Sequence, residues 1–116
     1  MSETRIIDPD TGGVKGSKPE RMDLIPWDAV KVISRVYNYG ASKYEDPDIG
    51  PHNWRRGYRW SLSYAALMRH ITAWWEGEDN DPESGHSHLA HAAWHCLTLI
   101  WFTLHNKGKD DRWKTP

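Results

Sequence analysis

Apolar residues recur at helical spacing in three segments of the chain, and we find no convincing pair of strands. The first helix is expected to begin at Pro26 or Trp27, because proline suits the first helical turn. Gly40 is expected to end that helix or to lie at a tight helix crossing. The pattern therefore predicts an all-α fold with three main helices, over residues 26–39, 61–75 and 87–106.

The third predicted helix is apolar nearly all round from Leu97 to Leu104. A helix without a polar face is buried on every side, which in a chain this short requires a partner subunit. We therefore expect a homo-oligomer assembled through this helix, with Cys96 as a small core residue. The core residues expected from the first two helices are Val30, Ile33, Val36, Tyr37, Leu62, Ala65, Ala66, Ile71 and Trp75.

The helical domain is expected to span residues 24–106, between a polar arm and a polar tail. The arm, residues 1–23, is rich in Gly and Pro, and is either a loose tail or a flap that orders over a phosphate. Its cations Lys15, Lys18 and Arg21 would bind that phosphate. The tail, residues 107–116, is expected to be loose, with Trp113 as an anchor.

The composition narrows the classes of function. A net charge of -1 provides no general attraction for nucleic acid or for an acidic membrane. The apolar run 97–104 is too short to cross a bilayer, and the first residues lack the apolar core of a signal peptide. A single cysteine suits a reducing cytoplasm. Eight tryptophans indicate a subunit interface or a surface on which an aromatic ligand stacks.

Carboxylates and imidazoles gather between the second and third predicted helices. His88, His91 and His95 share one helical stripe, and a His-x-x-His pair can hold one cation. Carboxylates favour Mg²⁺ or Mn²⁺, and imidazoles extend the choice to Co²⁺ or Zn²⁺. The alternative is an acidic loop between helices with exposed histidines. The candidate metal ligands are His70, Glu78, Asp81, His88 and His91.

A second group interleaves cations with aromatic residues. Its members Lys43, Tyr44, Asn53, Trp54 and Arg55 could hold a polyphosphate and stack on a base. The alternatives are a surface loop with cation–π pairs and a single-stranded nucleic-acid site, and the near-neutral charge favours a small nucleotide over the latter. Together, the two groups suit metal-assisted attack of water on a phosphoanhydride.

Short motifs recur in a familiar order along residues 12–104. They are Gly13-x-Lys15, Lys18-Pro19, Arg21-x-Asp23-Leu24-Ile25-Pro26, Gly40-Ala41-x-Lys43-Tyr44, Asn53-Trp54-Arg55-x-Gly57, Arg69-His70, Gly77-Glu78 and His88-Leu89-Ala90. In this order the chain resembles the phage-encoded, MazZ-like dATP/dGTP diphosphohydrolase family, which is compared with the all-α MazG-type nucleotide pyrophosphohydrolases. The resemblance implies a divalent cation and cleavage of dGTP or dATP to the monophosphate and pyrophosphate, in the host cytoplasm if the chain is phage-encoded.

The resemblance implies roles for individual residues. Glu78, His70 and Arg69 would be catalytic, and the cations and aromatic residues of the motifs would bind substrate. The MazG-type pattern has ExxE on one helix and ExxD on another, whereas here the second helix lacks ExxE and residues 88–91 form HxxH. Two alternative functions therefore remain open. One is a nucleotide sponge that sequesters a signalling nucleotide without cleaving it, and the other is a structural or DNA-associated phage protein.

Overall fold

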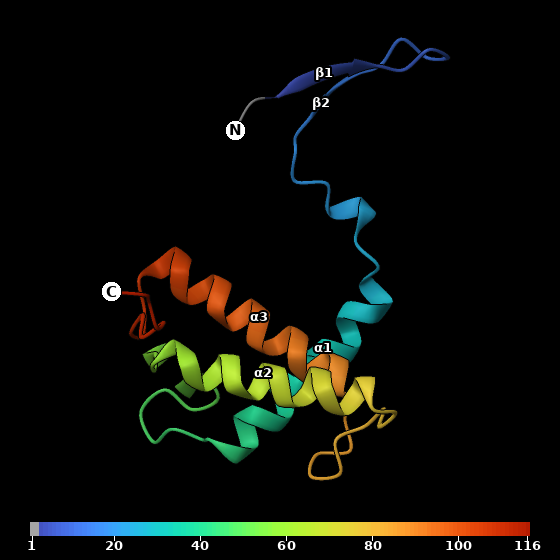
Figure 1. The fold of residues 1–116 in the computed structure, drawn as a ribbon. Helices are drawn as coiled ribbons and strands as arrows, with labels where there is room; N and C mark the ends of the chain where they lie inside the picture. The colour runs from blue at the N-terminus through green and yellow to red at the C-terminus, as the bar shows by residue number, and fades with distance from the viewer. Residues whose placement is uncertain (1–2) are drawn as a thin grey trace.

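Three helices form the body of the protein, and a short β-hairpin precedes them (Figure 1). The structure, a computed structural model, describes residues 3–116. The hairpin pairs β1 (Thr4–Ile7) with β2 (Val14–Ser17), and the 3-10 turn η1 (Met22–Leu24) follows. The helices are α1 (Trp27–Lys43), α2 (Trp60–Trp75) and α3 (His88–His105), with the 3-10 turn η2 (Asn53–Arg56) before α2.

The hairpin corrects the expectation of an all-α chain without paired strands. Its turn is closed by the Asp8 carboxylate, which accepts hydrogen bonds from the backbone N–H groups of Asp10 and Thr11, both at 2.9 Å. The strands have four residues each, and the adjacent Ile6 and Ile7 break any alternation of apolar and polar positions. The signal of a strand pair is therefore too short to find in the sequence, and the fold is mostly, but not wholly, helical.

Helix α1 is longer than expected, because Gly40 lies inside it and the helix ends at Lys43. A Cβ at Gly40 would meet no atom within 4 Å, so the residue is at no tight crossing either. A helix tolerates one glycine at a cost of about 1 kcal/mol relative to alanine. The extension matters for the site, since it brings Lys43 onto the same helical face as Tyr39, four residues earlier.

Helices α2 and α3 pack against each other, and α1 packs against α3. The buried apolar residues are Val36, Ala90, Ala92 and Phe102, as the sequence predicted for Val36. On α2, however, the buried residue is Ser63, whereas Leu62, Ala65 and Trp75 are exposed, against expectation. The apolar pattern of α2 misleads because the face that meets α3 is partly polar, with Ser63 and His70 bonded to histidines of α3.

One face of α3 lies open in the described chain. Leu97, Ile100 and Leu104 are 43%, 56% and 75% exposed, and Cys96 is exposed beside them and not in the core as expected. The cysteine was misplaced because an apolar neighbourhood in sequence does not tell which side of a helix is covered. No helix among residues 3–116 is long and apolar enough to cross a membrane.

The start of the C-terminal tail is held in place, contrary to the expectation that it is loose. The Trp60 indole N–H donates to the carbonyl of Lys107 at 3.1 Å, and the backbone N–H of Ser61 donates to the Asp111 carboxylate at 2.9 Å. Trp113, the expected anchor, is 83% exposed. The anchor is therefore polar and lies earlier, because the unpaired N–H groups at the start of α2 need acceptors.

Candidate functional site

The acidic connection between α2 and α3 is a closed turn, which fixes its side chains against α3. The backbone N–H of Asp81 donates to the carbonyl of His86 at 2.8 Å, and that of Gly85 to the carbonyl of Asp81 at 2.7 Å. The Asp81 carboxylate accepts from the Ser84 hydroxyl at 3.0 Å. Ser87 then caps α3, its hydroxyl accepting from the N–H of Ala90 at 3.3 Å.

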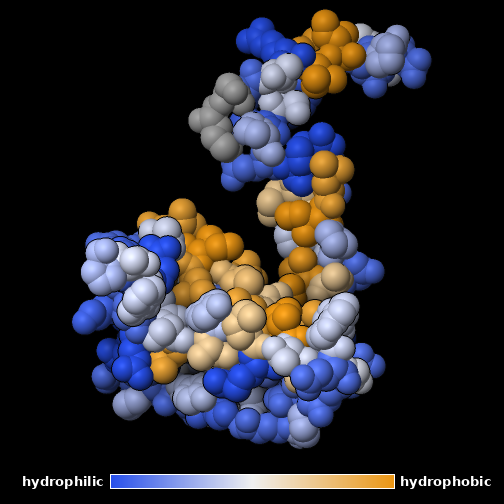
Figure 2. All heavy atoms as spheres, in the orientation of Figure 1, coloured by the Kyte–Doolittle hydropathy of each residue, from blue (hydrophilic) through white to orange (hydrophobic). Residues whose placement is uncertain are grey.

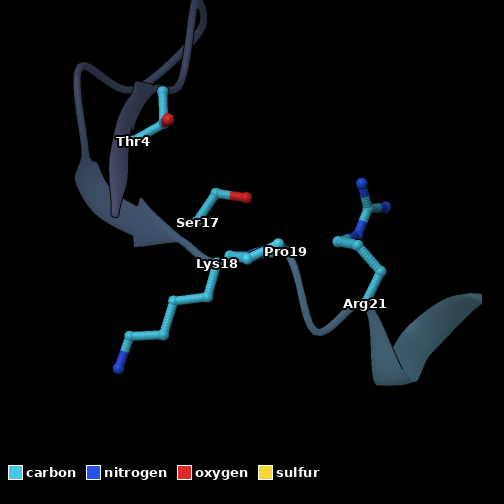
Figure 3. Close-up of a pocket in the computed structure, with 5 residues that line it drawn as sticks. All are labelled: Thr4, Ser17, Lys18, Pro19 and Arg21. Atoms are coloured by element: carbon cyan, nitrogen blue, oxygen red, sulfur yellow. The ribbon is translucent and has the colours of Figure 1, made fainter. Parts of the chain in front are cut away.

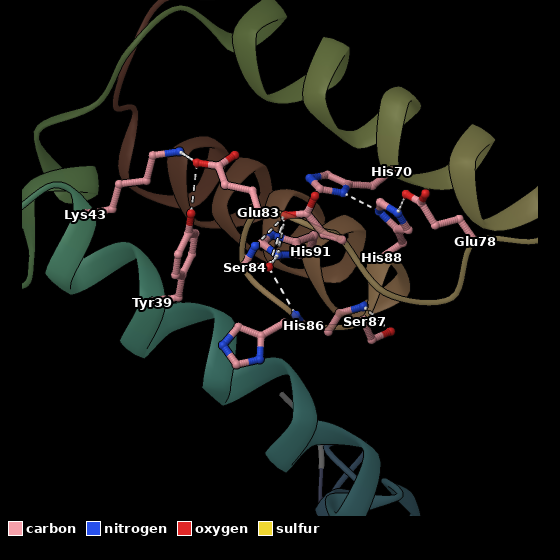
Figure 4. Close-up of polar contacts among 12 residues, drawn as sticks. Tyr39, Lys43, His70, Glu78, Glu83, Ser84, His86, Ser87, His88 and His91 are labelled. Atoms are coloured by element: carbon pink, nitrogen blue, oxygen red, sulfur yellow. Dashed lines mark hydrogen bonds and ion pairs between the residues drawn. The ribbon is translucent and has the colours of Figure 1, made fainter.

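Two histidines and a glutamate form a bonded chain at this end of the helix pair (Figure 4). Nδ1 of His70, on α2, lies 2.8 Å from Nδ1 of His88, on α3. Nε2 of His88 lies 2.7 Å from Oε1 of Glu78. His88 is buried and Glu78 is half exposed, so this series of bonded side chains runs from the helix interface to solvent. A line of exchangeable protons from inside to outside suits acid–base chemistry.

A second group of hydrogen-bonded side chains begins at His91, one turn further along α3. Its ring stacks on that of His70 with centroids 4.4 Å apart, and its Nε2 lies 2.7 Å from the Ser84 hydroxyl and 3.6 Å from Asp81. Burial, and after it the neighbouring His70, lower the pKa of His91 to about 4. Burial also lowers the pKa of His70. Both rings are therefore neutral at pH 7, the form that binds a metal or accepts a proton.

His95 continues the stripe, but its partners are structural. Its Nδ1 lies 2.9 Å from the buried Ser63 hydroxyl, which also bonds the Tyr58 hydroxyl. Burial lowers the pKa of His95 to about 4. The stripe predicted from the sequence therefore exists, with its first two members near carboxylates and its third inside the helix pair.

Helix α1 reaches the cluster through Glu83. The carboxylate of Glu83 accepts from Nζ of Lys43 at 2.6 Å and from the Tyr39 hydroxyl at 3.0 Å (Figure 4). The pKa of Lys43 is raised, chiefly by its hydrogen bond to Glu83. A predicted phosphate-binding lysine thus lies beside the histidine cluster, with a carboxylate where an anion would bind. Tyr44, whose ring lies 5.3 Å from Nζ of Lys43, is exposed and available to a ligand.

The proposed metal ligands are brought to one end of the α2–α3 pair, but they are bonded in two groups. His70, His88 and Glu78 form one, and Asp81 and His91 belong to the other. Within residues 3–116, no three His, Cys, Asp or Glu side chains are arranged to hold a metal ion. The cation stays a prediction.

The other predicted substrate residues lie elsewhere on the body. Nδ2 of Asn53 donates to the Asp46 carboxylate at 2.8 Å, within a loop that precedes α2. Trp54 packs edge-on against Trp101 with ring centroids 5.0 Å apart, and the Arg55 guanidinium lies over both rings at 4.9 and 5.2 Å. This set is an aromatic core with a cation on its rim, so any role in binding a nucleotide would use the exposed Arg55.

Arg69 and the arm residues point to neither group. Arg69 is exposed and lines a shallow hollow of about 370 Å³ on α2 with Met68, Thr72, Ala73 and Glu76. Lys18 and Arg21 line an open hollow of about 290 Å³ with Thr4, Ser17 and Pro19 (Figure 3). Arg21 is paired with Asp23 at 2.8 Å. Lys15 lies on β2 opposite Ile6.

Three residues of the site were not predicted: Tyr39, Glu83 and Ser84. Tyr39 precedes Lys43 by one helical turn, so the longer α1 would have placed it beside the lysine. Glu83 and Ser84 carry no pattern of their own, because a turn of this kind is recognised only from its backbone hydrogen bonds.

Comparison with known proteins assigns the chain to a family. A family model described as "dATP/dGTP diphosphohydrolase, N-terminal" matches residues 9–112, which include both histidine groups, Lys43 and most of the arm. The chain belongs to this family. The resemblance stated from the sequence motifs is thereby confirmed.

A relative in this family is known from a phage. It is a protein named dATP/dGTP diphosphohydrolase of Salmonella phage PMBT28, 31% identical over 80 residues, which are 69% of this chain and 26% of that protein. The chain thus spans about a quarter of the length of the relative that it matches. No solved structure matches the chain.

Proposed function

We propose that this chain hydrolyses a purine deoxynucleoside triphosphate, dGTP or dATP, to the monophosphate and pyrophosphate. The observation that carries the proposal is the cluster of imidazoles and carboxylates at the end of α2 and α3, with Lys43 at its edge. The name of the family and of its phage relative supports the substrate.

The residues would divide the work by charge. Lys43 would release Glu83 and bind a phosphate, because a triphosphate carries several negative charges and outcompetes a single exposed carboxylate for an ammonium group. His88 and Glu78 would accept and pass on the proton of the attacking water, since they are bonded to each other at 2.7 Å and lead to solvent. The exposed Arg55 and Tyr44 would contact the rest of the nucleotide.

The proposal includes a divalent cation, because the site holds imidazole and carboxylate groups, which are common ligands of such ions. Nε2 of the neutral His91 and Oδ2 of Asp81 lie 3.6 Å apart, a separation that two ligands of one cation can span. Mg²⁺ and Mn²⁺ commonly use one or two protein ligands and take the rest from substrate phosphates and water. Asp81 and His91 would hold the cation, which would polarise a phosphoryl oxygen of the substrate.

Product analysis tests the proposal. The purified chain is incubated with each of the four deoxynucleoside triphosphates, with Mg²⁺, Mn²⁺ or EDTA, and the products are separated by anion-exchange chromatography. We expect monophosphate and pyrophosphate from dGTP or dATP, and none with EDTA. Nucleotide that is retained by the protein and recovered intact after denaturation would favour the sponge and contradict the proposal.

A further inference from the structure

The hairpin and its connection extend away from the helices and not along them (Figure 1). The radius of gyration is 18.7 Å, whereas a compact chain of this length has about 13 Å. The difference comes from the described part of the arm, residues 3–23, and from its short link to α1, because the three helices pack on one another. An extended arm of this size requires a reason to hold its shape.

The hairpin of the arm leaves its large apolar side chains exposed. Ile6, Ile7 and Val14 are 55%, 66% and 60% exposed, although they are the large apolar side chains of the hairpin. A two-stranded hairpin alone in water is marginally stable at best and needs a further strand or a helix to pack against. Something must therefore cover the apolar residues of this hairpin.

The connection holds the hairpin away from the helices of its own chain. The Arg21 guanidinium bonds the Asp23 carboxylate at 2.9 and 2.8 Å, and the Trp27 indole N–H donates to the carbonyl of Met22 at 2.9 Å. Pro19 and Pro26 restrict the backbone on either side of this turn. These contacts lie within residues 21–27 and fix the turn before α1. The hairpin is therefore directed away from the helices of its own chain, and a second copy is the better cover.

The body offers a surface that complements the arm. Figure 2 shows apolar surface on the side of α3 that faces the arm, and α3 exposes Leu97, Ile100 and Leu104. Beyond the start of α3 lies the acidic connection, whose residues 76, 78, 79, 81 and 83 are all carboxylates. Lys15 and Lys18 of the arm form no ion pair within the described residues. The body thus exposes apolar and acidic residues, which are the kinds of partner that the exposed apolar and basic residues of the arm lack within their own chain.

We infer that the arm of one copy of this chain packs on the body of a second copy, and that its Lys18 and Arg21 complete the phosphate site of that second copy. Lys18 and Arg21 line one hollow together with Thr4 and Ser17, and ammonium and guanidinium groups both bind phosphate oxygens. Each site then has a body from one chain and an arm from the other. This inference rests on the proposed function for the identity of the ligand.

Complementation between two inactive variants tests the shared site. One variant carries Lys18→Ala and Arg21→Ala, and the other carries His88→Ala. The two are co-expressed with different tags, and the mixed species is purified by both tags in turn and assayed with dGTP below its KM. A two-fold dimer with shared sites contains one intact body–arm pair, so the mixed species should recover about half of the wild-type activity.

If the arm serves its own chain, the mixed species contains no intact site and stays inactive; that result, with an active wild type, overturns the inference. Two copies of the His88→Ala variant under different tags provide the control, which should be inactive on either view. If the wild type does not cleave dGTP at all, the proposed function fails, and the arm is tested by assembly instead.

Sedimentation velocity gives that second measurement. Ile7→Asp in the full chain should shift the protein from dimer to monomer, because the charge lies on the face that the second copy covers. The matched control is Ile49→Asp in the loop before η2, a residue that is also exposed, and it should leave the dimer intact. A monomeric wild type, or an unchanged sedimentation coefficient for Ile7→Asp, would contradict the inference.

Discussion

Two polar networks stabilise this fold, and they differ in the donors that satisfy them. In the loop before η2, the buried Asp46 carboxylate accepts from the Asn53 amide at 2.8 Å, from Arg56 at 3.0 Å and from the backbone N–H of Asp48 at 2.9 Å. Between α2 and α3, by contrast, His70, His88 and His91 bond mainly to one another and to side chains of the acidic connection.

The difference separates a structural network from a chemical one. Every donor to Asp46 is an N–H group that keeps its proton at neutral pH, so no proton moves within this network. The Arg56 guanidinium holds the pKa of the Asp46 carboxyl well below its usual range. In the histidine network, either ring nitrogen of the His70–His88 pair can carry the shared proton. Asp46 fixes a loop, whereas the histidines can exchange protons and partners.

The largest expected effect is on catalysis. Glu78→Gln should reduce hydrolysis of dGTP by about 10²- to 10⁴-fold, the range for loss of a general acid or base, because the amide cannot accept a proton from His88. Steady-state kinetics measures this, and far-UV circular dichroism checks that the helices remain. Glu45→Gln is the matched control, an exposed glutamate of the loop after α1. Equal rates for both variants would remove the His88–Glu78 chain from the mechanism.

Asp46→Ala should have the opposite effect, on stability more than on catalysis. The change leaves Arg56, Asn53 and two backbone N–H groups without their acceptor. We expect the melting temperature to fall by about 5 °C or more, with kcat retained at temperatures where the variant is folded. Differential scanning calorimetry and kinetics at 20 °C measure the two quantities. An unaltered melting temperature would contradict the structural role of Asp46.

Lowering the pH should reduce the folding stability of the wild type through the histidine network and not through Asp46. In the unfolded chain His91 and His95 gain protons near pH 6.5, whereas in the folded chain they stay neutral down to about pH 4. The unfolded state thus binds more protons in this window, so stability is full above pH 6.5 and falls as the pH drops toward 4. Melting temperatures from pH 7.5 to 4.5 should show the fall.

The assignment to the histidine network is checked by variants. His95→Gln should flatten the pH dependence, and His52→Gln, in an exposed loop, should leave it unchanged. A wild-type melting temperature that is constant over this range would mean that the histidines are not shielded from protons.

A smaller effect is expected at the edge of the cluster. Lys43→Ala should raise the KM for dGTP about tenfold or more, as for the loss of one charge-assisted hydrogen bond, with kcat less affected. Glu83→Gln should lower KM, because it frees the lysine from the carboxylate that now binds it at 2.6 Å. Steady-state kinetics of both variants, with Lys31→Ala on the exposed side of α1 as the control, tests this pair. A KM raised by Glu83→Gln would show that the glutamate positions Lys43 for the substrate.

The helices were predictable because their signals are local. The spacing of apolar residues, Pro26 before α1 and Gly77 after α2 place all three to within a few residues. The His88, His91 and His95 stripe follows from the same period. The predictions that were wrong depend on how the helices pack on one another. They concern which face of α2 meets α3, and which side of α3 exposes Cys96.

The site was predictable in composition more than in geometry. Helical spacing identified the histidines, but the sequence holds no signal that joins Glu83 to Lys43, since they lie 40 residues apart. It likewise assigned Asn53 to a ligand, whereas the structure commits its amide to Asp46. An asparagine beside cations suits either role, and only the fold brings the carboxylate to it.

The most direct test of the catalytic role of the histidine network is product analysis of three proteins in parallel: wild type, His88→Ala and Asp46→Asn. Each is incubated with dGTP and Mn²⁺ at 20 °C, and dGMP and pyrophosphate are quantified by chromatography. We predict both products from the wild type and from Asp46→Asn, and intact dGTP with His88→Ala, whose helices remain by circular dichroism. Wild-type amounts of dGMP and pyrophosphate from His88→Ala would contradict the catalytic role of the histidine network.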